Sequence, residues 1–220
     1  MLKHWTAEDI PWDCFDPARV DADMLRLVKA AAMVEKNSAD YATYLKNVFP
    51  DDADFIAAAD HWATEEVQHG DVLGRWAEMA DPDFRFAERF RVFQDGYKIP
   101  VDAAASVRGS RAGELVARCV VEVGTSSYYT SLAGGTEEPV LKVICQRIAG
   151  DEFRHYKLFY THLNRYVGRE KPGTLARLRV AIGRIIETDD DELAYAYYAG
   201  NNTGEAYERR RNADAYAARA

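Results

Sequence analysis

The chain has 220 residues, of which 48% are hydrophobic and 29% charged, and these values are typical of a globular protein with a substantial core. Its formal net charge of −8 makes nucleic acid and anionic membranes poor candidate partners. The three cysteines, Cys14, Cys119 and Cys145, are scattered and form no CxxC pair, which argues against a disulfide framework and against a thiolate zinc site.

The N-terminal residues indicate a cytoplasmic protein. The opening stretch, MLKHWTAEDIPWD, lacks the apolar core of a signal peptide, and no apolar stretch is long enough to cross a bilayer. Unpaired cysteines fit a reducing compartment. We therefore expect no membrane span and a cytoplasmic location.

The helical pattern begins after an irregular arm. Residues 1–20 contain tryptophans and prolines without a sustained period, so we expect an arm that lies over the surface of the domain. Residues 21–49 predict a first helix, whose inward face is apolar except for one acid, Glu35. Pro50 ends this helix.

A second helix is predicted from the aspartates at positions 51–54, any of which can cap it, to about Met79. It contains the segment TEEVQHG, in which Glu66 and His69 are three residues apart. Residues i and i+3 lie on the same helical face, so this carboxylate and imidazole point in one direction. The face is otherwise apolar, which indicates that the pair is buried.

A third long helix is predicted over residues 101–133, after a shorter amphipathic helix within residues 83–99. The inward face of the long helix is again apolar except for one acid, Glu122. The aromatic side chains of the shorter helix are typical of packing rather than chemistry.

The fourth helix is predicted to begin at Thr136 or Glu137 and to end near Val167. It contains GDEFRHY, where Glu152 and His155 repeat the spacing of the first acidic and imidazole pair. Three further elements follow: a helix over residues 175–188, a short helix over residues 191–199, and a terminal helix or frayed tail over residues 205–220.

The pattern predicts an all-α fold, namely a ferritin-like four-helix bundle with additional short helices. The first and second helices supply Glu and then a Glu/His pair, and the third and fourth helices do the same, which is the arrangement of ferritin-like bundles. We expect residues 1–20 to form the arm, residues 21–168 the di-metal bundle, and residues 169–220 C-terminal helices that pack on it.

Six inward side chains are the predicted metal ligands. A buried carboxylate without a partner costs several kcal/mol, so a matched set in a core indicates a bound cation. Mixed oxygen and nitrogen ligands suit two iron ions, with manganese as an alternative. We assign Glu35, Glu66 and His69 to one ion and Glu122, Glu152 and His155 to the other, with Glu66 and Glu152 as bridges. The alternative is that these side chains are exposed or pair with arginines.

Three neighbours of the ligands are further site candidates. Asp151 precedes a ligand and can accept the second N–H of His69, which fixes the tautomer of the imidazole. Glu65 has the same position beside Glu66, although acids are common in the N-terminal halves of helices. Thr125 is one turn beyond Glu122 and can donate a hydrogen bond toward the oxygen site or, equally, to its own i−4 carbonyl.

These motifs resemble those of the soluble acyl-acyl carrier protein desaturases of the ferritin-like di-iron superfamily. WATEEVQHGDVL is similar to their WTAEENRHGDLL, and IAGDEFRHYK to their IAADEKRHE. The EVGT segment at residues 122–125 is similar to their ERAT, and Glu35 falls where their first ligand helix places its glutamate. The resemblance covers roughly residues 22–165.

The resemblance implies the same six ligands, with Thr125 as the threonine beside the oxygen site. It also implies a di-iron centre, reduction by a ferredoxin-like donor, a homodimer, and removal of two hydrogens from an acyl chain on acyl carrier protein. The chain is shorter than the plant enzymes, and Val67 and Gln68 replace their Asn-Arg. A small aliphatic molecule is therefore kept as an alternative substrate.

Two functions follow from these expectations. The first is an oxygen-activating di-iron oxidoreductase that acts on an acyl or aliphatic substrate, for which an apolar tunnel past the third helix would be the distinguishing feature. The alternative is a ferritin-like or rubrerythrin-like protein that oxidises iron or scavenges peroxide. A scaffold that has lost its chemistry is a third alternative, against which six intact ligands argue.

Overall fold

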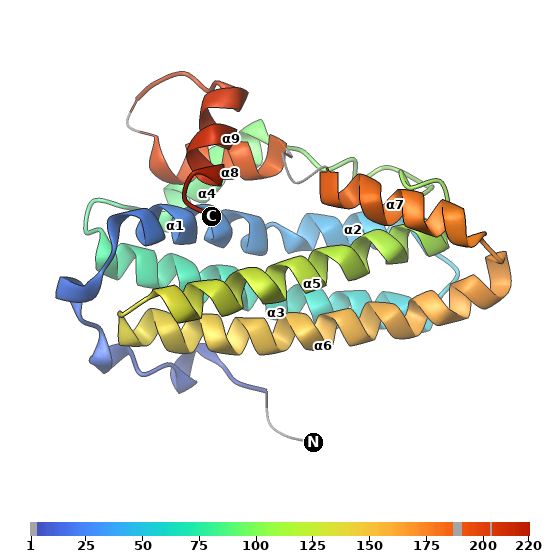
Figure 1. Cartoon of the computed structure of the whole chain (residues 1–220), viewed down its shortest axis with the longest axis horizontal. Helices are drawn as coiled ribbons and strands as arrows, with labels where there is room; N and C mark the ends of the chain where they lie inside the picture. Colours follow the sequence, from blue (N-terminus) through green and yellow to red (C-terminus); the bar gives the residue numbers. More distant parts are fainter. Residues whose placement is uncertain (1–3, 187–190, 203) are drawn as a thin grey trace.

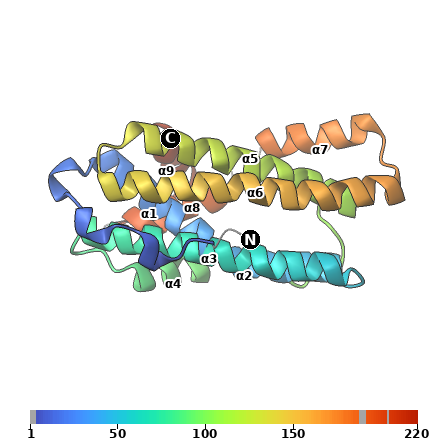
Figure 2. The same ribbon diagram turned by 90° about the horizontal axis from the view of Figure 1, so that it is seen from below.

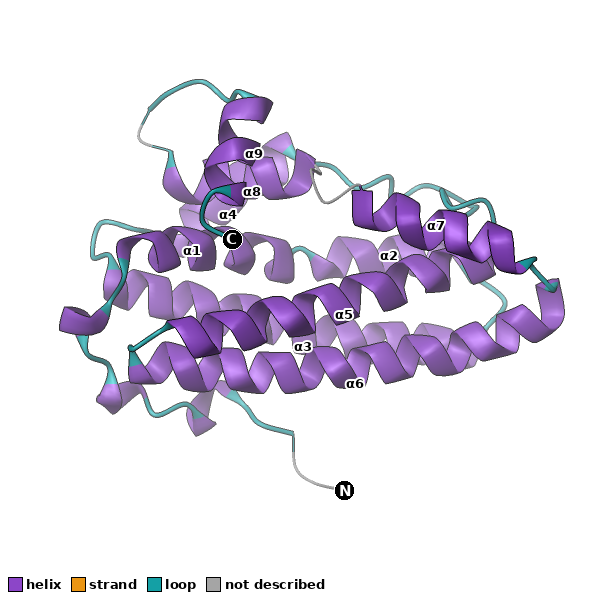
Figure 3. Ribbon diagram, viewed as in Figure 1, coloured by secondary structure: helices purple, strands orange, loops and turns teal. Residues whose placement is uncertain are grey.

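The computed structural model describes residues 4–186, 191–202 and 204–220, and over these residues it is helical without any strand (Figures 1 and 3). The predicted all-α class is therefore confirmed. The first three residues of the predicted arm and the last two of the predicted helix over 175–188 lie outside the described residues.

The long helices lie in two layers. Helix α5 packs on α6, and α3 packs on both α1 and α2, which follow one another along the molecule. Figure 2 shows the α5 and α6 layer over the layer of α1, α2 and α3. The bounds are α1 (Ala22–Lys36), α2 (Ser38–Val48), α3 (Ala53–Ala80), α5 (Arg111–Gly135) and α6 (Pro139–Glu170).

The predicted single helix over residues 21–49 is wrong, because α1 and α2 are separate. They meet at Asn37, whose backbone has a ψ of 0° and whose N–H is shared between the carbonyls of Met33 and Val34. Bonds to i−3 tighten the last turn of a helix, so α1 ends here. Glu35 lies in this last turn.

The predicted start of the third long helix at residue 101 is also wrong. Gly109 has a φ of 82°, a left-handed conformation that interrupts any helix. Ser110 then caps α5, since its hydroxyl accepts a hydrogen bond from the backbone N–H of Gly113 at 2.9 Å. The ten residues before Arg111 form turns instead of helix.

The starts of α3 and α6 show which acids act as caps. Asp52 accepts a hydrogen bond from the N–H of Phe55 at 3.1 Å, within the predicted range of caps for α3. Glu138 caps α6, rather than the predicted Thr136 or Glu137, and Pro139 occupies the first helical position. Glu138 is completely buried, so its carboxylate is fixed inside the protein.

Smaller elements cover the long helices. Helix α7 packs on α5, and α8 packs on α1, α4 and α9, so the C-terminal elements contact the long helices (Figure 1). Their bounds are α4 (Phe86–Gly96), α7 (Thr174–Ile186), α8 (Asp191–Asn201) and α9 (Arg209–Ala217). Among the described residues, no helix combines the length and the apolar character required to cross a bilayer.

The N-terminal arm is not wholly irregular, because it contains three short 3₁₀ turns, η1 (Ala7–Asp9), η2 (Trp12–Cys14) and η3 (Pro17–Arg19). The Trp5 indole donates a hydrogen bond to Asp151 at 2.8 Å, and the Arg147 guanidinium donates one to the carbonyl of Asp9 at 3.0 Å. The arm is therefore tied to α6.

Two apolar clusters lie on either side of a polar layer. On α3, Trp62 belongs to one cluster and Leu73 to the other. On α6, Ile148 belongs to the same cluster as Leu73, and Phe159 belongs to the same cluster as Trp62. The Glu/His pairs lie between these residues in both helices, so water-excluding side chains flank the acids on both sides.

Candidate metal centre

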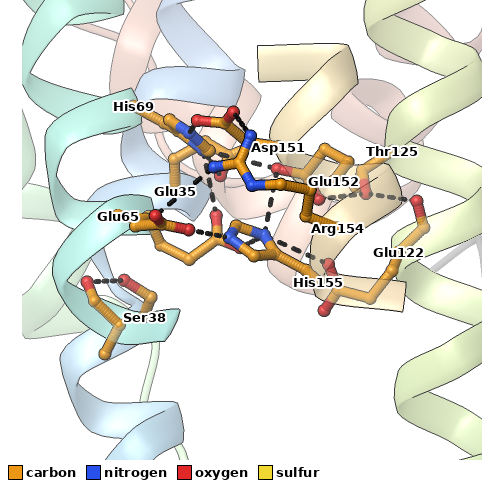
Figure 4. A network of polar contacts seen from close by, with 12 residues as sticks. Glu35, Ser38, Glu65, His69, Glu122, Thr125, Asp151, Glu152, Arg154 and His155 are labelled. Atoms are coloured by element: carbon orange, nitrogen blue, oxygen red, sulfur yellow. Dashed lines mark hydrogen bonds and ion pairs between the residues drawn. The ribbon is translucent and has the colours of Figure 1, made fainter. Parts of the chain in front are cut away.

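Six side chains from four helices converge on this polar layer (Figure 4). Each is at most 8% exposed, so the alternative of surface acids paired with arginines does not hold for them. Helices α1 and α5 supply one residue each, whereas α3 and α6 supply two each. The residues are Glu35 on α1, Glu66 and His69 on α3, Glu122 on α5, and Glu152 and His155 on α6.

A close approach between α1 and α3 brings Glu35 to the other ligands. A Cβ atom on Gly70, the residue after His69, would lie 2.6 Å from the backbone nitrogen of Lys36. Only glycine permits this contact between two backbones. The last turn of α1 therefore lies directly against the turn of α3 that holds a Glu/His pair.

One group of ligand atoms surrounds His69. Its Nδ1 atom lies 3.4 Å from Oε2 of Glu66, 3.3 Å from Oε1 of Glu152 and 3.8 Å from Oε2 of Glu35. These four residues offer atoms that all lie within 4.8 Å of one another. They form a group that can hold a metal ion.

The second group surrounds His155. Its Nδ1 atom lies 2.9 Å from Oε1 of Glu66, 3.6 Å from Oε2 of Glu122 and 3.9 Å from Oε1 of Glu152. The atoms of this group also lie within 4.8 Å of one another. Glu66 and Glu152 belong to both groups, so these two carboxylates occupy the position expected of bridges.

The unsatisfied atoms of the site fit a cation. Four buried atoms form no hydrogen bond: Nδ1 of His69 and of His155, Oε2 of Glu122 and Oε1 of Glu152. Leaving a buried polar atom unpaired is costly, and all four belong to residues of the two groups. A metal ion would accept lone pairs from all of them, so the residues present suit a bound metal.

Without a bound metal ion, protonation of these residues would offset part of the buried negative charge. Burial raises the pKa of Glu35 and of Glu122 well above the usual range, and neighbouring carboxylate charges raise it further. Burial alone would lower the pKa of His69 and His155, but the facing carboxylates raise it well above the usual value. A metal ion would displace these protons when it binds.

Two acids that precede ligands in the sequence contact the Nε2 atoms of the two imidazoles. Asp151 lies 3.0 Å from Nε2 of His69, which is the predicted contact. Glu65 lies 2.7 Å from Nε2 of His155, so the second candidate makes the same contact on the other histidine. Each imidazole is thereby oriented with Nδ1 toward the carboxylates.

Hydroxyl groups hold two of the glutamates. The Thr125 hydroxyl is 3.1 Å from its own i−4 carbonyl, at Val121, which is one of its two predicted partners, and 2.7 Å from Oε2 of Glu152, which was not predicted. The Tyr129 hydroxyl donates a hydrogen bond to Oε1 of Glu35. The sequence pattern did not indicate this contact between Tyr129 and Glu35.

The N-terminal arm covers the histidine side of the site, which no sequence signal indicated. The Trp5 indole stacks on His69 with a centroid distance of 5.9 Å and an interplanar angle of 6°. His4 lies 3.2 Å from Glu65, and Arg154 donates hydrogen bonds to Asp151 and Glu65. The arm and Arg154 therefore close this side of the layer.

The carboxylate side of the site opens into a cavity of about 990 Å³. The four ligand glutamates line it, whereas neither ligand histidine does. Its walls include apolar residues along α5, such as Val116 and Val120, and residues of α7, α8 and α9. An apolar chamber of this size beside convergent polar groups is typical of a small-molecule site.

No protein-family model and no curated protein matches the chain. The candidate metal centre therefore depends on the geometry of its own residues: six buried ligands, two shared carboxylates and four unpaired atoms.

Proposed function

We propose that the protein is a di-iron oxidoreductase built on a ferritin-like four-helix bundle, and that it oxidises an apolar acyl or aliphatic substrate. The observation that carries this proposal is the pair of overlapping ligand groups, which share Glu66 and Glu152 and border an apolar cavity. Ferritin-like di-metal sites use this set of residues from four helices.

Charge balance supports two divalent ions. Four buried carboxylates carry four negative charges, and two divalent cations neutralise them while both histidines stay neutral. One ion would leave a net negative charge in a layer flanked by apolar clusters, which is costly. Mixed oxygen and imidazole ligands suit iron or manganese, and we propose iron.

The two sides of the site have different roles. On the covered side, Asp151 and Glu65 fix the histidines, and the arm excludes water there. On the open side, the glutamates face the cavity, so free coordination positions and substrate would meet there. Two ferrous ions bound here would supply two electrons to dioxygen, and the chain's own residues would hold the substrate apart from water.

The identities of the partners come from the resemblance to the acyl-acyl carrier protein desaturases. We propose a ferredoxin-like electron donor, a homodimer, and an acyl carrier protein substrate or a small aliphatic molecule. Trp5, Asp151 and His69 form a continuous series of contacts from the arm to the ligand layer. A donor that docks on the arm would be close to the metals through these residues.

Metal analysis and oxygen consumption test the proposal. Protein loaded anaerobically with Fe(II) is expected to bind about two ions, and then to consume oxygen faster when an apolar substrate is present. Substrate-independent oxygen uptake with growth of ferric mineral would favour the iron-oxidising alternative. Failure to bind iron or manganese would contradict both.

A further inference from the structure

A buried arginine lies in the cavity wall, and its Nε atom has no hydrogen-bond partner among the described residues. Arg118 is on α5, four residues before Glu122, and is only 7% exposed. Its Nε atom is buried and forms no hydrogen bond, and no described residue accepts a hydrogen bond from the guanidinium. The group lies over the ring of Tyr41, 4.8 Å from the ring centroid, and lines the cavity.

The acids near Arg118 already have other partners. Glu192 accepts a hydrogen bond from the Tyr41 hydroxyl at 2.8 Å. Glu114 accepts hydrogen bonds from Tyr44 and from Ser106, both at 2.7 Å. The third acid, Glu122, belongs to the ligand layer. The buried Nε–H of Arg118 therefore has no acceptor among the described residues, in a side chain that lines the cavity and carries five N–H donors.

The guanidinium stays charged in this position. Burial alone would lower the pKa of Arg118, but Tyr41 and the surrounding acids raise it above the usual value. A buried charge without hydrogen bonds is costly, and a bound anion would remove this cost. The planar fork of arginine matches a carboxylate with two parallel hydrogen bonds.

We propose that the cavity binds a monocarboxylic acid with an apolar body, whose free carboxylate pairs with Arg118 while its chain lies against α5 toward the metal centre. This inference rests on the proposed function and names the substrate class of that site. Arg118 and Glu122 are one turn apart, about 6 Å along the helix axis. The carbon atoms that reach the metals would therefore be close to the carboxylate.

Binding of three matched ligands tests the proposal without any variant. Decanoate, methyl decanoate and decylamine share one apolar chain and differ in the charge of the head group. We expect decanoate to bind the Fe(II)-loaded protein about tenfold to a hundredfold more tightly than methyl decanoate in anaerobic calorimetry, since a hydrogen-bonded charge pair has this effect.

Variants then assign the preference to Arg118. The Arg118→Gln variant should bind the acid and the ester equally, and Arg118→Lys should keep part of the preference because the positive charge remains. Arg179→Gln is the control, since Arg179 is exposed on α7 and does not line the cavity. It should keep the full preference.

Three results would overturn the proposal: equal affinity for decanoate and its ester, tighter binding of decylamine, or an acid preference that disappears when the metals are removed. The last result would mean that the carboxylate binds the metals themselves. Oxygen consumption is measured separately. Acid binding that depends on Arg118 in a protein that consumes no oxygen would refute the proposed oxidase function and leave this inference standing.

Discussion

Nδ1 of His69 on α3 lies 3.3 Å from Oε1 of Glu152 on α6, and neither atom forms a hydrogen bond. The two residues are separated by more than eighty positions in the chain and are at most 2% exposed. A buried pair of this kind is unfavourable unless something lies between the partners, and a metal ion satisfies both atoms.

The two shared carboxylates should be necessary for the binding of both ions. Because Glu66 and Glu152 belong to both ligand groups, Glu66→Ala and Glu152→Ala are expected to lose both ions. Glu35→Ala and Glu122→Ala should each retain about one, since each residue belongs to one group only. Elemental analysis of the purified variants measures this difference.

The control for this series is Glu88→Ala, because Glu88 is exposed on α4 and belongs to neither ligand group. It should keep the metal content of the unmodified protein. Equal metal loss in Glu35→Ala and Glu66→Ala would contradict the assignment of bridges.

Asp151 should influence metal affinity without being a ligand. Removing the acceptor of the Nε2 proton leaves the His69 ring less firmly oriented and less basic, so Asp151→Asn should weaken metal binding by about tenfold to a hundredfold. Competition with a chelator measures the affinity. The control is Asp71→Asn, which changes only an exposed ion pair with Lys36 and should have little effect on metal affinity. An equal loss of metal affinity in both variants would refute the role of Asp151.

Gly70 should be necessary for the approach of α1 to α3. An added Cβ would lie 2.6 Å from the Lys36 backbone nitrogen, and a backbone atom cannot rotate away, so Gly70→Ala should lower the free energy of unfolding by about 1 to 3 kcal/mol. Its affinity for metal should also fall because Glu35 is displaced. Urea unfolding and elemental analysis measure the two effects.

Gly124→Ala is the matched control for this prediction. An added Cβ on Gly124 would meet nothing within 4 Å. Alanine favours helix by about 1 kcal/mol over glycine, so this variant should be at least as stable as the unmodified protein. Stabilisation of both variants would show that α1 and α3 are not in close contact.

The metal-free protein should lose stability as the pH rises above neutrality. The pKa of His69 and of His155 is raised in the folded protein, so their charged forms stabilise the fold fully below the unfolded value of about 6.5. This contribution is lost as the pH rises through the folded values. The raised pKa of Glu35 and of Glu122 changes the free energy of unfolding in the same direction, because the folded protein also loses these protons as the pH rises.

Urea unfolding at about pH 6 and about pH 9 tests this linkage. The free energy of unfolding of the metal-free protein should be lower at the higher pH. The metal-loaded protein should show a smaller change, because ions replace the protons. A metal-free protein that is more stable at the higher pH would contradict the assigned protonation.

Helical periodicity explains which parts of the site could be predicted. Glu66 and His69, like Glu152 and His155, are three residues apart, and a helix places such pairs on one face whatever lies around it. Glu35 and Glu122 were identifiable because each is the single acid on an otherwise apolar face. The all-α class follows from the same period.

Features that depend on contacts between distant segments could not be predicted in this way. The interruption at Asn37 is in a stretch whose apolar period continues, and the start of α5 depends on the backbone of Gly109. The contact between Trp5 and Asp151 joins residues 146 positions apart. Periodicity also gives no information on the cavity beside Arg118, which is lined by residues of α1, α2, α3, α5 and α6 together with the C-terminal elements.

The most direct test of the central claim is an anomalous diffraction map from crystals of the protein loaded with Fe(II). We predict two peaks inside the helical layers, one beside Glu35 and His69 and the other beside Glu122 and His155, with Glu66 and Glu152 between them. A map without a peak among these six residues, or with metal only at the protein surface, would contradict the proposed di-iron centre.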